Sequence, residues 1–504
     1  MPKKKNTGRI LRQHISRLKQ MNKFLSELVK TEENISSIKI NGITSDSRNV
    51  MPGFIFAALP GSKTNGKKFI SDAINKGAVV VIAETGTKIS CSDTLLITSD
   101  NPRSKYAKIA SKFYTEKPSW LGAVTGTNGK TSVACFTSQL WNSMNLKGAA
   151  IGTLGINSIE YKSSLDLTTP EPVTLHRELS EISTRGLDYA IIEASSHGLD
   201  QSRLDGITFE AAAFTNLSHD HLDYHITYEK YKNAKLRLFS DLINNNGTAV
   251  LNRDSNEFKE FSTVAKRNNI SVISYGSDIR SDICLVSSIP KSVGQEIEIN
   301  VSGKRERLLF PLFGDFQAHN AMCALGLVIA SGADANKAIQ SLGHLTGVKG
   351  RLELVAELSN RARIFIDYAH SPEALEKTLL SVKNYTRGKL NLVFGCGGNR
   401  DEAKRITMGQ IASKYSNKIY VTDDNPRKEN PEKIRRAILS GCPDGLDIGD
   451  RRKAIFLAVS ELEPGDILVI AGKGHETDQL YNDRVKPFDD RYEVKKAIVY
   501  ERVQ

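Results

Sequence analysis

A glycine-rich segment at residues 125–131 has the residue types that hold the phosphates of a nucleotide. It reads Thr-Gly-Thr-Asn-Gly-Lys-Thr and lies between an apolar run and a predicted helix. Glycines let backbone N–H groups approach phosphate oxygens, and a helix N-terminus favours an anion. We expect Lys130 to neutralise phosphate charge and the Thr131 hydroxyl to bind Mg²⁺. Gly126 precedes Gly129 by only three positions, which departs from the usual spacing, so a ligand-free turn is the alternative.

An acidic residue, Glu193, ends the predicted strand at residues 189–193. In open α/β sheets, ligands gather at the carboxyl ends of the strands. A carboxylate there, in the sheet that carries the phosphate loop, is a natural Mg²⁺ ligand. The alternative is a structural carboxylate that caps the backbone at Ser195 and Ser196.

A second predicted strand end is followed by three closely spaced histidines, His219, His221 and His225. Imidazoles suit zinc, so a binuclear metallohydrolase is one interpretation. That signature places the last histidine next to an aspartate, whereas Tyr224 separates Asp223 from His225 here. We favour one imidazole that assists a Mg²⁺–ATP site, and we expect His219 and His225 to be ordinary loop-surface histidines.

A predicted helix at residues 227–239 carries a lysine on its apolar face. Lys235 lies four positions after Tyr231 and seven after Tyr228, and so shares their face. A lysine turned inward must meet an anion or lose its charge. The alternative is an apolar stem whose ammonium reaches water at the edge of the face.

The elements that must position these residues alternate between strands and helices, which predicts an α/β protein with mostly parallel, doubly wound sheets. The length of 504 residues suggests about three domains. Residues 271–310 show short alternating strands, which we interpret as a small antiparallel appendage. The predicted divisions are a basic tail at 1–20, a small α/β domain at 21–113, a central domain at 114–345 and a Rossmann-like domain at 346–504.

The composition is that of a soluble globular protein, with 39% hydrophobic and 25% charged residues. No apolar run reaches the roughly 18 residues of a membrane span. The six cysteines form no CxxC pair, which fits a reducing compartment. Seven of the twelve net positive charges lie in residues 1–20, so the body is only mildly basic and a nucleic-acid partner is not expected. We expect this tail to be disordered, with nucleic-acid or anionic-surface contact, or an overlong start, as alternatives. Helical spacing at Phe24, Leu25 and Leu28 suggests a domain start near Met21.

Several motifs taken together resemble the Mur ligases, the ATP-dependent amino-acid ligases of peptidoglycan synthesis. The resemblance covers residues 21–504. It rests on the phosphate loop and on segments 193–199, 215–225, 313–320, 367–372, 395–400, 424–427 and 472–476, with 46–48 and 53–57 in support. It implies a UDP-muramoyl-binding domain, a central ATPase and an amino-acid-binding domain, in that order.

The resemblance also implies roles for individual residues near ATP. Those for ATP itself are Gly126, Thr127, Asn128, Gly129, Lys130, Thr131, Ser132, Asn320 and Arg351, with Asn252 and Asp254 less directly. Thr131, Glu193, His221 and Lys235 would surround Mg²⁺. Lys235 aligns with a lysine that CO₂ converts to a carbamate in this family, which accounts for its inward placement.

The remaining implied residues bind the two other substrates. Those for the UDP-N-acetylmuramoyl dipeptide are Ser45, Ser47, Ser62, Lys63, Thr64, Thr168, Thr169, Ser195, Gln201 and Arg203; Leu167 departs from the residue that related sequences can carry. Those for the incoming amino acid are Arg400, Asp424, Asn425, Pro426, Arg427, Gly472 and Glu476. Lysine-adding relatives usually lack the arginine at the position of Arg427, so the motif favours meso-diaminopimelate, whose distal carboxylate an arginine would bind.

The function that the resemblance implies is ATP-dependent addition of meso-diaminopimelate to UDP-N-acetylmuramoyl-L-alanyl-D-glutamate in the bacterial cytoplasm, through an acyl phosphate, by a monomer. The alternatives are an L-lysine-adding or other sister ligase, and a folate polyglutamate synthase, which lacks this N-terminal pattern. A basic P-loop ATPase acting on nucleic acid is more distant, because it predicts basic residues along the body rather than in the tail.

Overall fold

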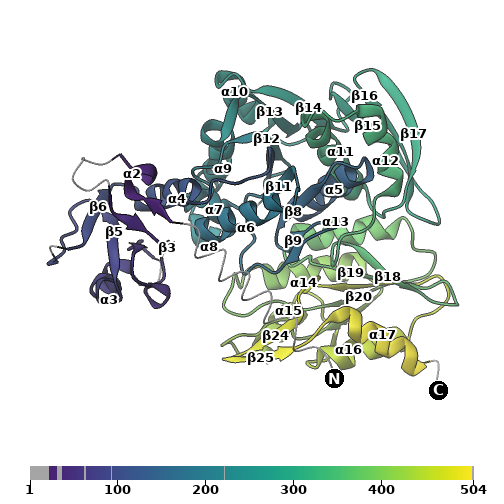
Figure 1. The fold of residues 1–504 in the computed structure, drawn as a ribbon. Coiled ribbons are helices and arrows are strands. Elements are labelled where there is room, and N and C mark those ends of the chain that lie inside the picture. The colour runs from purple at the N-terminus through teal and green to yellow at the C-terminus, as the bar shows by residue number, and fades with distance from the viewer. Residues whose placement is uncertain are drawn as a thin grey trace, which may run out of the picture.

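The computed structural model describes residues 22–30, 37–61, 64–91, 93–218, 220 and 222–501. The predicted tail at 1–20, and also Ser62, Lys63, His219 and His221, lie outside the described residues. Within the described ranges, sheets of four, eleven and six strands follow one another along the chain, together with two pairs of short strands. Figure 1 shows the four-stranded sheet at one end of the molecule and the six-stranded sheet below the eleven-stranded one. The predicted α/β class is confirmed.

The four-stranded sheet is parallel throughout, in the order β3-β4-β5-β6. Its strands are β3 (Gly42–Thr44), β4 (Phe54–Ala57), β5 (Ala78–Glu84) and β6 (Leu95–Ser99). β5 reads Ala-Val-Val-Val-Ile-Ala-Glu, the nearly continuous apolar run of a strand covered on both faces. Helices α3 (Ile70–Asn75) and α4 (Pro102–Phe113) cover it, and α4 also lies beside the central domain (Figure 1).

The predicted helical start near Phe24 is only partly right. Phe24 belongs to the short strand β1 (Lys23–Phe24), which pairs with β2 (Lys39–Ile40), and its ring is exposed. A single helical turn, α2 (Leu25–Leu28), follows it and buries Leu25 and Leu28. Strand pairing therefore turns Phe24 away from the face that its spacing predicts.

The eleven-stranded sheet has a parallel centre with antiparallel strands at both edges, in the order β10-β9-β8-β11-β7-β12-β13-β14-β15-β16-β17. Its strands are β7 (Trp120–Thr125), β8 (Gly148–Gly152), β9 (Gly155–Asn157), β10 (Lys162–Ser163), β11 (Tyr189–Glu193), β12 (Phe209–Phe214), β13 (Ile243–Asn252), β14 (Ser271–Gly276), β15 (Ile283–Pro290), β16 (Gln295–Val301) and β17 (Lys304–Phe310). The prediction of a small antiparallel appendage at 271–310 is confirmed for β15–β17, which pair antiparallel, and wrong for residues 271–276. β14 joins the sheet in parallel, and β15–β17 extend the same sheet as hairpins.

Alternate residues of the central strands face two cores. In β11, Ile191 points into the first core and Ala190 and Ile192 point into the second, as the two-residue period of a strand requires. Helices α5 (Lys130–Ser143), α11 (Asp315–Ala330) and α12 (Ala335–Ser341) cover the first face. Helices α6 (Pro172–Thr184), α7 (Ser196–Asp200) and α10 (Phe258–Arg267) contribute to the second, with the π-helical turn Leu238–Leu242 that follows α9 (Tyr228–Arg237).

The six-stranded sheet has the order β18-β19-β23-β20-β21-β22 and is parallel except for its first strand. Its strands are β18 (Glu353–Glu357), β19 (Arg363–Asp367), β20 (Leu390–Phe394), β21 (Lys418–Val421), β22 (Leu446–Asp447) and β23 (Ile467–Ala471). Helices α13 (Pro372–Lys383), α14 (Lys404–Tyr415) and α15 (Pro431–Leu439) cover one face. Helices α16 (Arg451–Ser460) and α17 (Asp490–Glu501) cover the other, so this sheet is doubly wound as predicted.

No helix in the described ranges combines the length and the apolarity that a bilayer span requires.

Candidate functional site

The phosphate loop has the predicted strand–loop–helix context. β7 ends at Thr125 and α5 begins at Lys130. Gly129 precedes α5 with a φ of 90°, and Gly126 has a φ of 146°, both in the range that favours glycine. A Cβ on Gly126 would lie 1.9 Å from Thr215 Oγ1, and one on Gly129 would lie 2.4 Å from Asn320 Oδ1. Both glycines are therefore required by geometry.

Lys130 folds back over this loop. Its Nζ donates to the carbonyl oxygens of Gly126 at 2.8 Å and Thr127 at 2.9 Å. Removal from water lowers the pKa of Lys130, against the attraction of Glu193 and Asp220. The side chain is thus held at the mouth of the loop, where a phosphate oxygen would replace a carbonyl as its partner.

Glu193 lies at the carboxyl end of β11, directly beside the phosphate loop. Its carboxylate accepts from Thr131 Oγ1 at 2.9 Å, and from Thr153 N at 2.8 Å and Oγ1 at 3.1 Å. The alternative in which it caps Ser195 and Ser196 is wrong, because Ser195 caps α7 with its own hydroxyl through Gly198 N. The structure therefore brings the Thr131 and Glu193 oxygens together, as the sequence predicts.

Lys235 is buried, with 1% of its surface exposed, which excludes the interpretation in which its ammonium reaches water. Its Nζ donates to Gly126 O at 2.8 Å and lies 4.5 Å from the centre of the Tyr231 ring. The Tyr231 hydroxyl in turn lies 2.9 Å from Thr127 Oγ1. Burial, and then the nearby Lys130 charge, lower the pKa of Lys235 well below its ordinary value. α9 thus directs an easily deprotonated amine at the phosphate loop.

The expectation that His225 lies on a loop surface was wrong. It is 4% exposed and packs among the rings of Tyr224, Tyr231 and His197. Its neighbours are aromatic because α8 (Leu222–His225), the short helix that ends at His225, lies against α7 and α9, and local sequence patterns do not reveal such contacts between elements. His221, the predicted metal ligand, lies outside the described residues.

A cleft of about 710 Å³, counting its part open to solvent, lies between the central and C-terminal sheets. Its walls include phosphate-loop residues and Asn216, Phe316, Asn320, Arg351, Asp367, Tyr368, His370 and Lys377. Arg351 crosses the domain junction: it donates to Thr131 Oγ1 at 3.1 Å and its guanidinium lies 4.5 Å from the Tyr368 ring centre. Gln317 Nε2 donates a hydrogen bond to Arg351 O at 2.9 Å. The cleft brings Asn320 and Arg351 together with the phosphate loop.

The residues predicted for the UDP-linked substrate fall into two groups. Thr169, Ser195, Gln201 and Arg203 form one hydrogen-bonded cluster: Arg203 donates to Thr169 O at 2.8 Å and Gln201 Oε1 at 2.7 Å, and the Thr169 and Ser195 hydroxyls lie 2.9 Å apart. The Thr168 hydroxyl lies 3.0 Å from the Thr153 hydroxyl, which also donates to Glu193. Ser45, Ser47 and Thr64 lie on the N-terminal domain, where Ser47 is buried and Thr64 exposed.

The residues predicted for the amino acid lie at the carboxyl ends of β20, β21 and β23. Asn425 Nδ2 donates to Glu476 Oε2 at 2.8 Å, and Arg427 Nη1 donates to Gly398 O at 3.0 Å. Gly472 has a φ of 108°, and a Cβ there would lie 2.6 Å from Asp424 Oδ2. Burial raises the pKa of the Asp424 carboxyl despite the nearby Lys473 and Arg451. Arg400 is exposed at the end of its glycine-rich loop, and Pro426 is buried in the turn that precedes Arg427.

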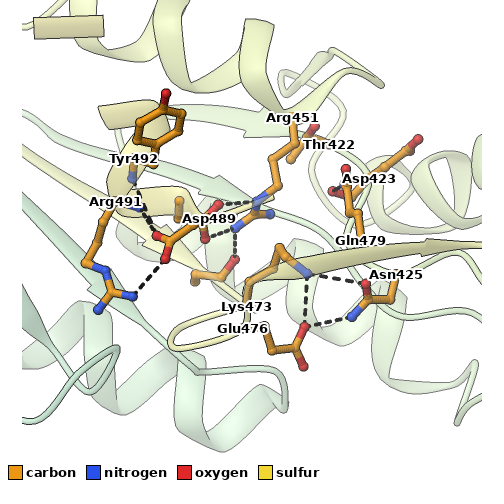
Figure 2. A network of polar contacts seen from close by, with 12 residues as sticks. Thr422, Asp423, Asn425, Arg451, Lys473, Glu476, Gln479, Asp489, Arg491 and Tyr492 are labelled. Atoms are coloured by element: carbon orange, nitrogen blue, oxygen red, sulfur yellow. Dashed lines mark hydrogen bonds and ion pairs between the residues drawn. The ribbon is translucent and has the colours of Figure 1, made fainter. Parts of the chain in front are cut away.

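Three buried charged residues next to this site, Lys473, Arg451 and Asp490, were not predicted from the sequence. Lys473 donates to Asn425 and Glu476 (Figure 2). Arg451 forms two hydrogen bonds with Asp490 and a third with Ala471 O. Lys473 lies within the Gly-Lys-Gly-His-Glu segment, which was the available signal. Arg451 and Asp490 are 39 positions apart, and no local pattern pairs them.

Three family models together match most of the chain. The Mur ligase family, catalytic domain, matches residues 39–126; the Mur ligase middle domain matches 124–328; and the Mur ligase, glutamate ligase domain, matches 350–474.

Similar proteins agree with these matches. The chain is 44% identical over 473 residues, 93% of its length and 96% of the relative's, to a UDP-N-acetylmuramoyl-L-alanyl-D-glutamate--2,6-diaminopimelate ligase of Bradyrhizobium diazoefficiens. It is 44% identical over 470 residues, 92% of its length and 94% of the relative's, to the ligase of the same name of Brucella melitensis. A solved structure of a ligase of this name is 31% identical with a TM-score of 0.71, covering 95% of this chain and 99% of that one. A MurF ligase of Thermotoga maritima in complex with ADP shares the fold at 17% identity, with a TM-score of 0.62, over 91% of this chain and 97% of that one. The phosphate loop, the cleft and these likenesses together show that the chain belongs to the Mur ligase family.

Proposed function

We propose that the protein is an ATP-dependent ligase that joins meso-diaminopimelate to UDP-N-acetylmuramoyl-L-alanyl-D-glutamate. The observation that carries the proposal is the Thr131 hydroxyl, which contacts both Glu193 of the central sheet and Arg351 at the start of the C-terminal domain. The terminal phosphate of ATP would therefore lie where the two domains meet, between a dipeptide and an amino-acid site. The names of the similar ligases support the choice of substrates.

The proposed reaction has two steps. A carboxylate is a poor acyl donor at neutral pH, so a carboxylate oxygen of the dipeptide attacks the γ-phosphorus of ATP, and the bond from phosphorus to ADP breaks. The amine of the amino acid then attacks the acyl carbon, the carbon–oxygen bond to phosphate breaks, and the nitrogen loses a proton. The products are an amide, ADP and phosphate. Lys130 and Arg351 would offset charge on the transferring phosphoryl group.

The oxygens around the phosphate loop fit a Mg²⁺ ion. Glu193 supplies a carboxylate and Thr131 a hydroxyl 2.9 Å from it, the hard oxygen ligands that Mg²⁺ prefers. We propose that these two residues, with His221 and a carbamate on Lys235, would hold it. When bound, Mg²⁺ offsets the negative charge of the phosphates.

The environment of Lys235 supports its carbamylation. CO₂ reacts with a neutral amine, and the lowered pKa of Lys235 favours that form. The new nitrogen–carbon bond forms as one proton leaves, and the carbamate nitrogen keeps one N–H. That N–H could continue to donate to Gly126 O, the present partner of Nζ at 2.8 Å.

The amino-acid site supports a substrate with a distal carboxylate. The Arg427 guanidinium is held by the Gly398 carbonyl, and Glu476 carries a carboxylate suited to an ammonium. L-lysine lacks the distal carboxylate and would leave Arg427 unpaired in a closed site. We further propose that the enzyme works as a monomer in the bacterial cytoplasm; its six free cysteines, five of them buried, suit a reducing compartment.

Phosphate release by the full-length protein tests the proposal. With ATP, Mg²⁺ and the UDP-linked dipeptide, release should require meso-diaminopimelate and should yield the UDP-linked tripeptide by mass spectrometry. L-lysine and D-alanyl-D-alanine serve as alternative acceptors. Turnover with lysine equal to that with diaminopimelate would refute the specificity, and ATP hydrolysis driven by DNA without dipeptide would refute the ligase assignment.

A further inference from the structure

The side chain of Lys473 is fully buried, with 0% exposure, in the loop that follows β23. Its Nζ contacts three acceptors: Glu476 Oε2 at 2.9 Å, Asn425 Oδ1 at 3.3 Å and Asp478 O at 2.5 Å. A lysine ammonium has three donors, so this set satisfies it completely. Lys473 therefore does not reach a ligand itself, and its effects must pass through its partners.

Lys473 decides how the Asn425 amide is oriented. Asn425 Oδ1 accepts from Lys473 and from Leu480 N at 3.0 Å, and both partners are donors. The oxygen must therefore face them, so Nδ2 must face Glu476, to which it donates at 2.8 Å. With the amide reversed, its NH₂ group would point at an ammonium and an N–H.

The same contacts divide the Glu476 carboxylate into two unlike oxygens. Oε2 accepts from both Lys473 and Asn425. Figure 2 shows the other oxygen pointing away from both of them. The Glu476 side chain is 31% exposed whereas Lys473 is not exposed at all, so the carboxylate forms the boundary between the buried network and the site.

A buried arginine, Arg451, anchors the backbone just before Lys473. Arg451 donates to Ala471 O at 2.9 Å, and its guanidinium makes a bidentate pair with Asp490 at 2.7 and 2.8 Å. Both side chains of this pair are completely buried. A planar arginine fork in such a pair fixes direction as well as distance. Arg451 therefore orients the backbone at Ala471, two positions before Lys473.

The charges around Glu476 make Lys473 its main cationic partner. Burial raises the pKa of Glu476, but the Lys473 charge and the hydrogen bonds from Lys473 and Asn425 hold that pKa below its ordinary value. The other titratable groups that face it are His475, Asp424, Tyr368 and Arg451. Burial lowers the pKa of His475 to about 4, so near neutral pH it is uncharged.

We propose that Lys473 is a positioning residue of the amino-acid site: by occupying one oxygen of Glu476 and the carbonyl oxygen of Asn425, it presents the other Glu476 oxygen to an ammonium of the incoming amino acid. The inference rests on the proposed function, which places Glu476 and Asn425 at that site. It adds that the specificity of the site depends on a cation that never touches the substrate.

Steady-state kinetics of Lys473→Met in the full-length enzyme test this. The substitution keeps length and removes the charge, so the KM for meso-diaminopimelate should rise about tenfold or more, as for the loss of a charge-assisted hydrogen bond. The kcat and the KM values for ATP and the UDP-linked dipeptide should stay near wild type. Lys486→Met is the matched control, because Lys486 is exposed on the neighbouring strand β25 (Arg484–Pro487).

A double variant separates positioning from a general loss of structure. If Lys473 acts through Glu476, Lys473→Met should add no further rise in KM to that of Glu476→Gln. The inference would be overturned if the two substitutions multiplied each other's effect on the KM for meso-diaminopimelate. It would also be overturned if the KM values for diaminopimelate, ATP and the dipeptide all rose together. Should Lys473→Met not fold, Lys473→Gln keeps a donor without the charge and should raise the same KM alone; an unchanged KM in either variant overturns the inference.

The wild-type enzyme tests the proposed function itself. Absence of diaminopimelate ligation by the wild type would overturn the proposed function, and this inference with it. An active wild type with normal diaminopimelate KM in Lys473→Met would overturn the inference alone.

Discussion

Lys130 Nζ and Lys235 Nζ donate to the same acceptor, the carbonyl oxygen of Gly126, each at 2.8 Å. One lysine comes from the start of α5 and the other from the last turn of α9, 105 positions later along the chain. The Lys130 charge is one of the causes that lower the pKa of Lys235, after burial. Two ammonium groups at one carbonyl would repel each other, which favours the neutral amine of Lys235, and conversion of that amine to a carbamate would place an anion beside Lys130.

Activity should depend on an anion at position 235. Lys235→Ala should lose about 100-fold or more in kcat, the scale of removing one electrostatic contact at a phosphoryl-transfer site. Acetate or formate should restore part of the activity by filling the vacated space, and chloride at equal ionic strength should not. Full activity of Lys235→Ala without added anion would contradict the carbamate.

The stability of the protein should show the cost of burying Lys235. Because its folded-state pKa is lowered, the unfolded chain binds more protons between the folded and unfolded pKa values, and stability rises with pH through that window. In CO₂-free buffer, Lys235→Met should therefore unfold at a higher urea concentration than wild type near neutral pH. The difference should shrink as the pH approaches the unfolded lysine value of about 10.4. A difference that is constant with pH would show that Lys235 is charged in the folded state.

Strain at Ile226 offers a separate test of the turn before α9. Its φ is 67°, in the left-handed region, and its β-branched side chain is 73% exposed. A left-handed conformation costs a residue of this type about 1–2 kcal/mol. Ile226→Gly should therefore raise the free energy of unfolding by about 1 kcal/mol, measured in urea, after the entropy of glycine is offset. Ile226→Val, which keeps the branch, should leave it unchanged; equal gains in both variants would point to lost surface hydrophobicity instead.

The phosphate loop should not tolerate a side chain at Gly129. Besides its φ of 90°, a Cβ there would meet Asn320 Oδ1 at 2.4 Å and push the loop away from α11. Gly129→Ala should raise the KM for ATP about tenfold or more, because a buried polar contact is displaced. Gly186→Ala is the matched control, since Gly186 also has a positive φ, 73°, but its Cβ would meet nothing within 4 Å. KM values for ATP that stay at the wild-type value in both variants would contradict the prediction.

The sequence predicts those parts of the site that depend on short-range periodicity. The spacing of Lys235 from Tyr231 sufficed to turn the lysine inward, and a strand-to-helix junction located the phosphate loop. The sequence does not predict β8, because Gly-Ala-Ala-Ile-Gly has a single β-branched residue, Ile151, among small ones; it forms a strand because β11 pairs with it. The burial of His225 and the Arg451–Asp490 pair depend on contacts between distant segments, which periodicity does not encode.

Selectivity for the incoming amino acid should depend on the guanidinium of Arg427. The residue has a φ of 54°, and its backbone N–H donates to Leu480 O at 2.9 Å, so the turn after Pro426 is fixed on both sides. Nη1 donates to Gly398 O at 3.0 Å, which directs the fork toward the loop that ends at Arg400. A planar fork matches a carboxylate, and L-lysine offers none at its distal end.

Arg427→Ala should therefore reduce kcat/KM for meso-diaminopimelate by about 100-fold and leave the small activity with L-lysine unchanged or higher, because the variant removes a half-buried guanidinium for which lysine offers no carboxylate. Gly397→Ala should have a weaker effect in the same direction, since a Cβ there would lie 2.7 Å from Arg427 Nη1 and displace the fork without deleting it. Gly303→Ala is a control for the substitution itself, because a Cβ at that exposed turn meets nothing within 4 Å. Competition between the two amino acids, read by mass spectrometry of the UDP-linked products, gives the ratio directly. If the ratio stays at the wild-type value in Arg427→Ala, the distal carboxylate is bound elsewhere, and Arg400 becomes the residue to replace next.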